Sequence, residues 1–306
     1  MRLLFCCLIL TVGCGSPTTE RADVPHANPE KVDLLAFIAH PDDEGVWGGA
    51  LTYYAHCRGK RVKLICLTSG EYGNGLPHPV EEGAVPDCSY DDSDYPCWHK
   101  IPAEELVYPN YYREQEMACA AETYGIELPV IHPRFPDMAG LQPWGAAEPG
   151  FSFWGGKDSV LAKMTEYIRT YQPEVILAMD WNGFNGNPQH IASARGAYYA
   201  AELAASSDHF SQQLATLGSW ETPKVYLHWM EGEEFNDNPL IKHDWRQTCE
   251  SLKENTVQQQ SAQAYACHES QEMTTSCDSV TQFVLVASQV GPDRPGVNDF
   301  FENLSD

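Results

Sequence analysis

The stretch VDLLAFIA, residues 32–39, is apolar except for one Asp, and a second mainly apolar stretch, RVKLICLT, follows at residues 61–68. Turn residues bound both stretches, which is typical of strands buried on both faces of a parallel sheet. The segment between them, residues 44–57, has the length of a helix. A strand, a helix and a strand in succession predict a βαβ unit, whose connection is right-handed.

The same alternation continues along the chain. Helices are predicted at residues 111–124, 161–171 and 191–205, and strands at residues 129–132, 175–179 and 225–229. This order predicts an α/β fold with a doubly wound, mostly parallel sheet. Two long loops, residues 71–110 and 135–156, interrupt the pattern, and loops of this length are usually functional. We therefore predict a single domain, residues 32–306, with long loops at its active site.

Two tryptophans of the second loop, Trp144 and Trp154, have two interpretations. An aromatic ring in such a loop either packs beneath the loop or offers a face on which a sugar ring stacks. The sequence leaves both alternatives open.

The composition is that of a folded and strongly acidic protein. The chain has 306 residues, of which 43% are hydrophobic and 11% aromatic, enough apolar material for one large core. The 43 Asp and Glu against 19 Lys and Arg give a formal net charge of −24. Because so acidic a surface repels phosphate backbones, we expect no nucleic-acid partner.

The first 13 residues have the pattern of an export signal. Arg2 precedes an apolar run, residues 3–12, that is too short to span a membrane. The run ends in Thr11-Val12-Gly13-Cys14, which resembles a bacterial lipoprotein signal in which Cys14 is acylated after cleavage. The alternative is an ordinary secretory signal. We expect an exported lipoprotein on the periplasmic or cell-surface face of a membrane, held only by its lipid, with residues 14–31 as a flexible tether.

Cysteine usage agrees with export. Once the two cysteines of the signal and Cys14 are set aside, eight of the 11 cysteines remain, and an even number is typical of a disulfide framework. They contain no C-x-x-C spacing, so neither a zinc–thiolate site nor a thioredoxin-like motif is predicted. Cys88 with Cys97 is favoured as a local bridge, and Cys267 with Cys277 comes next.

The sequence AHPDDE, residues 39–44, lies where the first strand ends and the first helix begins. Doubly wound sheets bind ligands in a crevice at this end of their strands. His40 and Asp43 can both turn toward one cation, and Asp42 between them is left free as a base. Acidic residues at this turn would repel a cofactor phosphate, so a nicotinamide or flavin cofactor is not expected. The alternative is that Asp42 or Asp43 only caps the helix.

A second polar segment follows the strand at residues 175–179. It reads DWNGFNGNPQH, residues 180–190, so His190 also lies at the carboxyl edge of the sheet. Two histidines and one carboxylate around Zn²⁺, with a position left open for water, are typical of hydrolytic zinc sites. We therefore predict a zinc site formed by His40, Asp43 and His190.

On these residues the chain resembles the PIG-L/LmbE-type N-acetylglucosaminyl deacetylases, zinc enzymes with a Rossmann-like fold. Residues 39–44 match the A-H-P-D-D-E motif of that family at every position. The resemblance implies that His40 and Asp43 bind zinc and that Asp42 is the general base. It also implies hydrolysis of the acetamide of an N-acetylated sugar or glycan, with release of acetate and an amine. The oligomeric state is not indicated.

The resemblance extends to other segments of the chain. Thr68-Ser69-Gly70 and Arg113-Glu114-Gln115-Glu116 resemble the T-x-G and R-x-x-E motifs of the family, which implies that Arg113 contacts substrate. Phe135-Pro136-Asp137 is similar to a further family segment, which places Asp137 in the substrate site. Residues 268–271 and 291–301 resemble the C-terminal segments more loosely.

The chain departs from the family pattern at Asn187. The family usually has H-x-D-H or H-x-N-H here, whereas this chain has Asn187-Pro188-Gln189-His190, which keeps the last His, the ligand. An amide can donate a hydrogen bond to an oxyanion, but it cannot shuttle a proton near neutral pH. Asn187 is then a catalytic residue with an altered function, and Asp42 or another group protonates the leaving amine. The alternative is a carbohydrate-binding lipoprotein that keeps the metal pocket and lacks turnover.

Overall fold

The computed structural model describes residues 31–70, 111–137, 141–230, 235, 237–271 and 278–304. The predicted export signal, the lipidated Cys14 and the tether up to residue 30 lie outside these residues. So do the loop at residues 71–110, with its Cys88–Cys97 pair, and Cys277.

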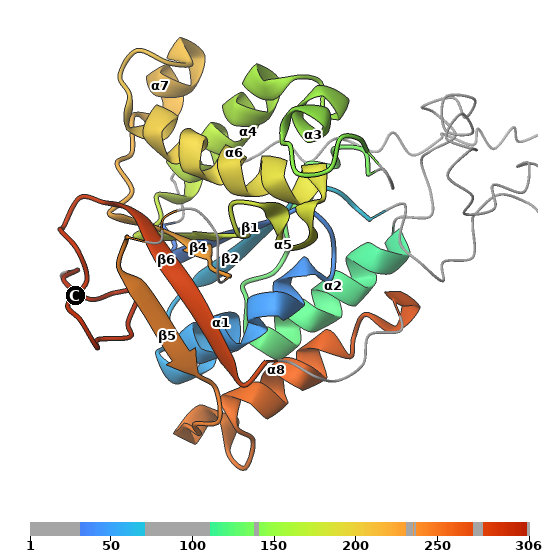
Figure 1. Ribbon diagram of the computed structural model, residues 1–306, viewed down its shortest axis with the longest axis vertical. Helices are drawn as coiled ribbons and strands as arrows, with labels where there is room; N and C mark the ends of the chain where they lie inside the picture. Colours follow the sequence, from blue (N-terminus) through green and yellow to red (C-terminus); the bar gives the residue numbers. More distant parts are fainter. Residues whose placement is uncertain are drawn as a thin grey trace, which may run out of the picture.

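A six-stranded sheet forms the centre of the molecule, in the order β2-β1-β3-β4-β6-β5 (Figure 1). Its strands are β1 Leu34–Ile38, β2 Val62–Cys66, β3 Val175–Ala178, β4 Lys224–His228, β5 Leu240–Asp244 and β6 Val280–Ser288. Neighbours among β2, β1, β3 and β4 run parallel, and β6 runs antiparallel to β4 and β5. The predicted α/β fold with a mostly parallel sheet is therefore confirmed.

Helices cover both faces of this sheet (Figure 1). The longer ones are α2 Tyr111–Tyr124, α4 Lys157–Tyr171, α6 Pro188–Ala205 and α8 Val257–Tyr265, and the shorter ones are α1 Gly48–Thr52, α3 Glu148–Phe153, α5 Gly183–Gly186 and α7 Ser211–Leu217. Single turns are η1 Asp43–Trp47, η2 Tyr53–Cys57, η4 Glu250–Leu252 and η5 Glu269–Gln271. None of the helices in the described ranges is long and apolar enough to cross a membrane.

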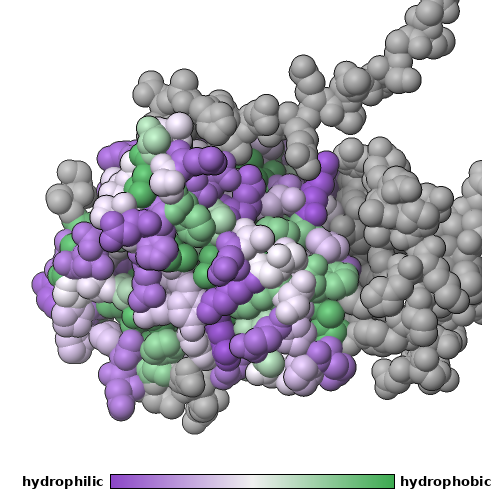
Figure 2. Space-filling model, turned by 90° about the horizontal axis from the view of Figure 1, so that it is seen from above, coloured by the Kyte–Doolittle hydropathy of each residue, from purple (hydrophilic) through white to green (hydrophobic). Residues whose placement is uncertain are grey.

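The continuous apolar sequence of β1 reflects burial on both faces. Leu34, Ala36 and Ile38 belong to the core under α1, α2 and α8, whereas Leu35 and Phe37 belong to the core under α3, α4 and α6. Alternate residues of a strand point to opposite faces, so both sets must be apolar. On the outer surface, hydrophilic residues are interspersed with hydrophobic ones on the face in Figure 2.

Several predicted elements differ from the structure. The predicted strand at residues 129–132 is reduced to one bridge between Ile65 and Ile131. The predicted helix at residues 44–57 is divided among η1, α1 and η2. In α1, a Cβ on Gly49 would lie 2.6 Å from the Trp245 ring, so glycine permits this close packing. Two strands, β5 and β6, and four helices, α3, α5, α7 and α8, were not predicted.

The disulfide pairing corrects the prediction for Cys267. The structure has two described disulfides, Cys57–Cys249 and Cys119–Cys267. Cys267 pairs with Cys119, and not with Cys277, because α2 and α8 pack together and bring the two Cα atoms to 5.9 Å. Among the described cysteines, Cys66 is free and buried in β2, so the even count does not correspond to a complete disulfide set.

His243 in β5 gives the stability of the fold a pH dependence. Its ring stacks on Trp245, with ring centroids 4.6 Å apart, and contacts Tyr54. Burial lowers the pKa of His243 to about 4, Asp299 opposes this shift and Arg58 adds to it. The pKa is about 6.5 in an unfolded chain, so the stability due to the neutral ring is complete above that pH. It is lost as the pH falls through 6.5 toward 4.

We expect His243→Phe to remove about 3 kcal/mol of the decrease in the free energy of unfolding between pH 7 and pH 4. Urea titrations of both proteins across this range measure the difference. An unchanged pH dependence in His243→Phe would contradict the assignment. A uniform loss of stability at every pH would reflect repacking and not titration.

Candidate metal centre

The predicted site lies where the strand order of the sheet reverses. β1 and β3 are parallel neighbours in which Phe37 is level with Ala178, while β2 lies beyond β1 and β4 beyond β3. The segments that leave β1 and β3 therefore start side by side and diverge. Such switch points are where open α/β sheets bind ligands.

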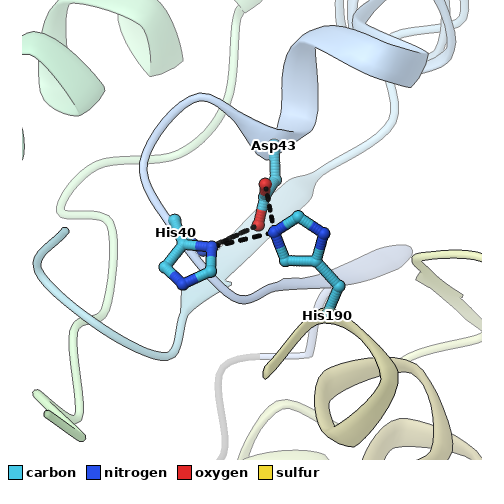
Figure 3. A group of neighbouring side chains, drawn as sticks. All are labelled: His40, Asp43 and His190. Atoms are coloured by element: carbon cyan, nitrogen blue, oxygen red, sulfur yellow. Dashed lines mark hydrogen bonds and ion pairs between the residues drawn. The ribbon is translucent and has the colours of Figure 1, made fainter. Parts of the chain in front are cut away.

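Three predicted ligands meet at this point (Figure 3). Nδ1 of His40 lies 3.0 Å from Nε2 of His190 and 3.4 Å from Oδ2 of Asp43, and Oδ1 of Asp43 lies 3.2 Å from Nε2 of His190. One ligand atom from each residue lies within 4.8 Å of the other two, and all three residues are buried. Side chains from two strand ends thus converge on one small volume.

The other nitrogen of each imidazole is already bonded. Nδ1 of His190 lies 3.1 Å from the carbonyl oxygen of Gly183, to which it donates. Nε2 of His40 lies 3.1 Å from Oδ1 of Asp137 and 3.2 Å from Oε1 of Gln189. Histidines that bind metals usually donate their second N–H to a carbonyl or carboxylate. Both rings therefore direct the nitrogen that can bind a metal toward Asp43.

The charges of the cluster also suit a cation. Burial alone would raise the pKa of Asp43, but His190 and His40 hold it well below its usual range. Burial alone would lower the pKa of His40, but Asp137 and Asp43 raise it well above its usual value. The carboxylates thus attract positive charge to this buried point, and a divalent cation would displace the proton. Two imidazoles and a carboxylate fit Zn²⁺.

Asp43 also holds the turn in shape. Its Oδ2 accepts hydrogen bonds from the backbone N–H groups of His40, at 2.7 Å, and Ala39, at 3.1 Å. Asp42 does not act as a helix cap, because its side chain makes no cap hydrogen bond to η1 within the described residues. The acidic pair therefore shapes the turn and lies at the cluster without capping the helix.

Asp42 lies beside the cluster in a strained backbone conformation. Its φ of 115° falls in the left-handed region, which a non-glycine residue rarely adopts. Oδ2 of Asp42 lies 3.1 Å from Nη2 of Arg113, and its backbone N–H donates to Oε2 of Glu44. Burial raises the pKa of Asp42 to about 6, with Arg113 opposing the shift and Asp43 adding to it. This carboxylate can exchange a proton near neutral pH.

Arg113 is buried and contacts the turn that carries Pro41 and Asp42. Its Nη2 donates to the carbonyl oxygen of Pro41 as well as contacting Asp42, and its Nη1 donates to the carbonyl oxygen of Gly70. A Cβ at position 70 would lie 2.4 Å from Nη1, so this approach needs glycine. The structure thus places Arg113 against Asp42 and Asp137 against His40. Their predicted contacts with substrate stay predictions.

A C-terminal segment completes the support of the acidic turn. Nε2 of His268 lies 2.6 Å from Oε1 of Glu44, and both side chains are fully buried. Glu116 accepts hydrogen bonds from the backbone N–H and the hydroxyl of Ser270. These contacts were not predicted from the sequence, in which the R-x-x-E motif and the loose resemblance at residues 268–271 were the only signals of them.

Asn187 has a structural function that was not predicted. It is the N-cap of α6, and its Oδ1 accepts a hydrogen bond of 2.8 Å from the backbone N–H of Gln189. Because His190 lies in the first turn of α6, this cap helps to fix the ligand. The Nδ2 group of Asn187 is the part of the amide that can donate to a bound oxyanion.

The two tryptophans of the second long loop differ in environment. Trp154 is buried, stacks on Phe135 with ring centroids 5.5 Å apart, and donates from Nε1 to the carbonyl oxygen of Pro136. Trp154 is therefore a packing residue. Trp144 is 46% exposed, so its side chain is accessible to a ligand.

Comparison with known proteins gives one family match. The model of GlcNAc-PI de-N-acetylase (PIG-L) matches residues 35–201, which include the segments carrying all three predicted ligands. The 1D-myo-inositol 2-acetamido-2-deoxy-alpha-D-glucopyranoside deacetylase of Streptomyces avermitilis is 32% identical over 200 residues, which are 63% of this chain and 60% of that protein. Its counterpart in Streptomyces scabiei is 33% identical over 201 residues, 63% of this chain and 54% of that protein.

Solved structures share the fold. N,N'-diacetylchitobiose deacetylase from Pyrococcus horikoshii has a TM-score of 0.50 and 18% identity, over 80% of this chain and 73% of that chain. GalB, the 4-carboxy-2-hydroxymuconate hydratase from Pseudomonas putida KT2440, has a TM-score of 0.54 and 16% identity, over 86% of this chain and 99% of that chain. Since a deacetylase and a hydratase are different kinds of enzyme, the fold alone does not identify the activity.

Proposed function

The chain belongs to the GlcNAc-PI de-N-acetylase (PIG-L) family, and we propose that it is a zinc-dependent deacetylase of N-acetylglucosamine-containing sugars or glycoconjugates. The observation that carries the proposal is the buried His40–Asp43–His190 cluster with Asp42 beside it. Two relatives named as deacetylases of an acetamido sugar support it, although the matches span 60% and 54% of their lengths.

The residues of the cluster and its neighbours would have different functions in the reaction. His40, Asp43 and His190 would hold the ion, and bound zinc supplies Lewis acidity that lowers the pKa of water and polarises a carbonyl. Asp42 accepts the proton of the attacking water. The C–O bond forms first and gives a tetrahedral oxyanion on the substrate, and the amide C–N bond then breaks as Asp42 returns the proton to the departing amine nitrogen. Arg113 fixes the Asp42 carboxylate for both transfers.

The proposal is tested by measuring acetate and primary amine released from N-acetylglucosamine, chito-oligosaccharides and peptidoglycan fragments by the zinc-loaded protein. We expect the two products in equal amounts from at least one of these substrates, because hydrolysis of one amide produces one of each. Binding of a sugar without release of either product would support the carbohydrate-binding alternative instead.

Variants of Asn187 separate its two functions. Asn187→Ser keeps an N-cap but removes the amide donor, so we expect a similar melting temperature and a kcat lower by about 10²–10³-fold, the range for loss of one oxyanion donor. Asn182→Ser, at a neighbouring position without a cap hydrogen bond among the described residues, is the control. An unchanged kcat in Asn187→Ser would show that Asn187 only caps the helix.

We also propose that the protein is exported and anchored by lipid on Cys14. Two disulfides among the described residues support an oxidising compartment. Cys14→Ser is then expected to move the protein from the membrane fraction to the soluble fraction, because the segment before it is too short to span. A wild-type protein that is already soluble after export would contradict lipidation.

A further inference from the structure

Two aromatic side chains are exposed next to the metal centre. Five large hydrophobic side chains are exposed in the described ranges: Leu128, Trp144, Phe184, Leu240 and Val290. Of these five, only Trp144 and Phe184 are aromatic. Trp144 is 46% exposed and Phe184 is 49% exposed. The loop that carries Trp144 is joined to α5, which carries Phe184, by a hydrogen bond of 2.8 Å from the N–H of Gly145 to the carbonyl oxygen of Gly186. The two exposed rings therefore belong to one local structure.

This local structure is attached to a predicted zinc ligand. Gly183, the residue before Phe184, accepts the Nδ1–H of His190 on its carbonyl oxygen. A Cβ on Gly183 would lie 3.0 Å from Cβ of His190, so the start of α5 packs directly against that residue. A Cβ on Gly186 would lie 3.7 Å from the Trp144 ring. The segments that carry the aromatic pair are thus connected to His190 through Gly183 and Gly186.

Phe184 has a strained backbone conformation as well as an exposed side chain. Its φ of 60° and ψ of −62° lie outside the regions that L-residues populate. Strained residues persist where the surrounding structure fixes them, and they concentrate at binding and catalytic sites. A half-exposed ring contributes less to the core than a buried one, so folding alone does not explain a strained Phe here. A ligand that covers the ring would explain it.

The surroundings indicate the chemistry of that ligand. Asp42 and Asp137 lie beside the cluster, Asp43 belongs to it, and the whole chain has a formal net charge of −24, so the protein's own charges disfavour a phosphate group. Aromatic faces stack well on flat, apolar surfaces. One face of a pyranose ring presents C–H groups and carries no charge. A neutral sugar ring therefore suits the pair better than a phosphate-bearing group.

We propose that Trp144 and Phe184 form a stacking platform for the sugar ring next to the N-acetylglucosamine unit at the metal centre. The protein then prefers uncharged oligosaccharides to the free monosaccharide. The position of the reacting unit rests on the proposed deacetylase function. The contact between the second sugar and the two aromatic rings does not depend on turnover.

Kinetics of zinc-loaded Trp144→Ala and Phe184→Gly test the platform. For tri-N-acetylchitotriose we expect KM to rise about tenfold in each variant, while kcat/KM for N-acetylglucosamine changes by less than about twofold. Phe184→Gly also relieves the strained φ, so its melting temperature is expected to equal or exceed that of the wild type. Leu240→Ala, an exposed hydrophobic residue in β5 at the far edge of the sheet, is the control.

Calorimetric titration of tri-N-acetylchitotriose into the same proteins separates this proposal from the proposed function. Weaker binding in Trp144→Ala supports the platform even if no variant releases acetate, in which case the deacetylase proposal fails alone. Equal binding and equal KM in the wild type and both variants would overturn the platform while acetate release still supported the deacetylase. A preference for a phosphate-bearing glycoside over the neutral trisaccharide would also overturn it.

Discussion

Asp42→Asn is expected to lower kcat by about 10²–10⁴-fold while the protein keeps its zinc and its fold. Asp42 lies beside the three clustered residues and contacts Arg113, and burial raises its pKa to about 6. The amide of Asn has nearly the same shape as the carboxylate but cannot accept the proton of the attacking water. The loss should therefore fall on kcat, and the metal content should stay near one ion per chain.

Steady-state kinetics and elemental analysis of the same sample decide this prediction. Asp244→Asn, at an exposed aspartate in β5 that pairs with Arg246, is a matched control and should leave both quantities unchanged. If Asp42→Asn loses zinc together with activity, Asp42 is a ligand and not the base. A kcat within about twofold of the wild type would assign the proton transfer to another group.

His190→Ala should remove the metal and with it nearly all activity. Nε2 of His190 lies 3.0 Å from Nδ1 of His40 and 3.2 Å from Oδ1 of Asp43, so its loss leaves two ligands on one turn. Two ligands are fewer than the three that catalytic zinc sites use, so we expect zinc well below one ion per chain. A kcat lower by at least about 10³-fold should follow, because a site that no longer holds zinc lacks the Lewis acidity that would lower the pKa of the attacking water.

The control for this variant is His209→Ala, which removes an imidazole beyond the end of α6. His209 is exposed and bonds to Ser206, and its loss should change neither zinc content nor activity. Stoichiometric zinc in His190→Ala, and also in Asp43→Ala, would exclude the proposed ligand set. Loss of zinc without loss of activity would exclude the proposed function of the ion.

The sequence predicted the elements whose pattern is local. The strand at β1 is recognisable because burial on both faces demands a continuous apolar run, and the helix at residues 111–124 coincides with α2. The meeting of His40 with His190 was predictable because the carboxyl ends of parallel strands share one edge of a sheet. This rule places residues 150 positions apart together without any knowledge of side-chain packing.

Features that depend on long-range packing were not predictable in this way. The pairing of Cys119 with Cys267 and the contact of Glu44 with His268 require that α8 lies against α2 and the first turns. The antiparallel strand β6 joins the sheet beside β4, although it follows β5 in sequence. Local patterns in the chain do not encode such neighbours.

The most direct test of the proposed activity is to measure acetate release from di-N-acetylchitobiose. It is measured before chelation, after removal of the metal, and after addition of one equivalent of Zn²⁺. We predict that release stops when the metal is removed and returns to its initial rate with one zinc ion per chain. Release that continues in the metal-free protein would contradict a metal-dependent deacetylase, as would a zinc-loaded protein that binds this sugar and releases no acetate.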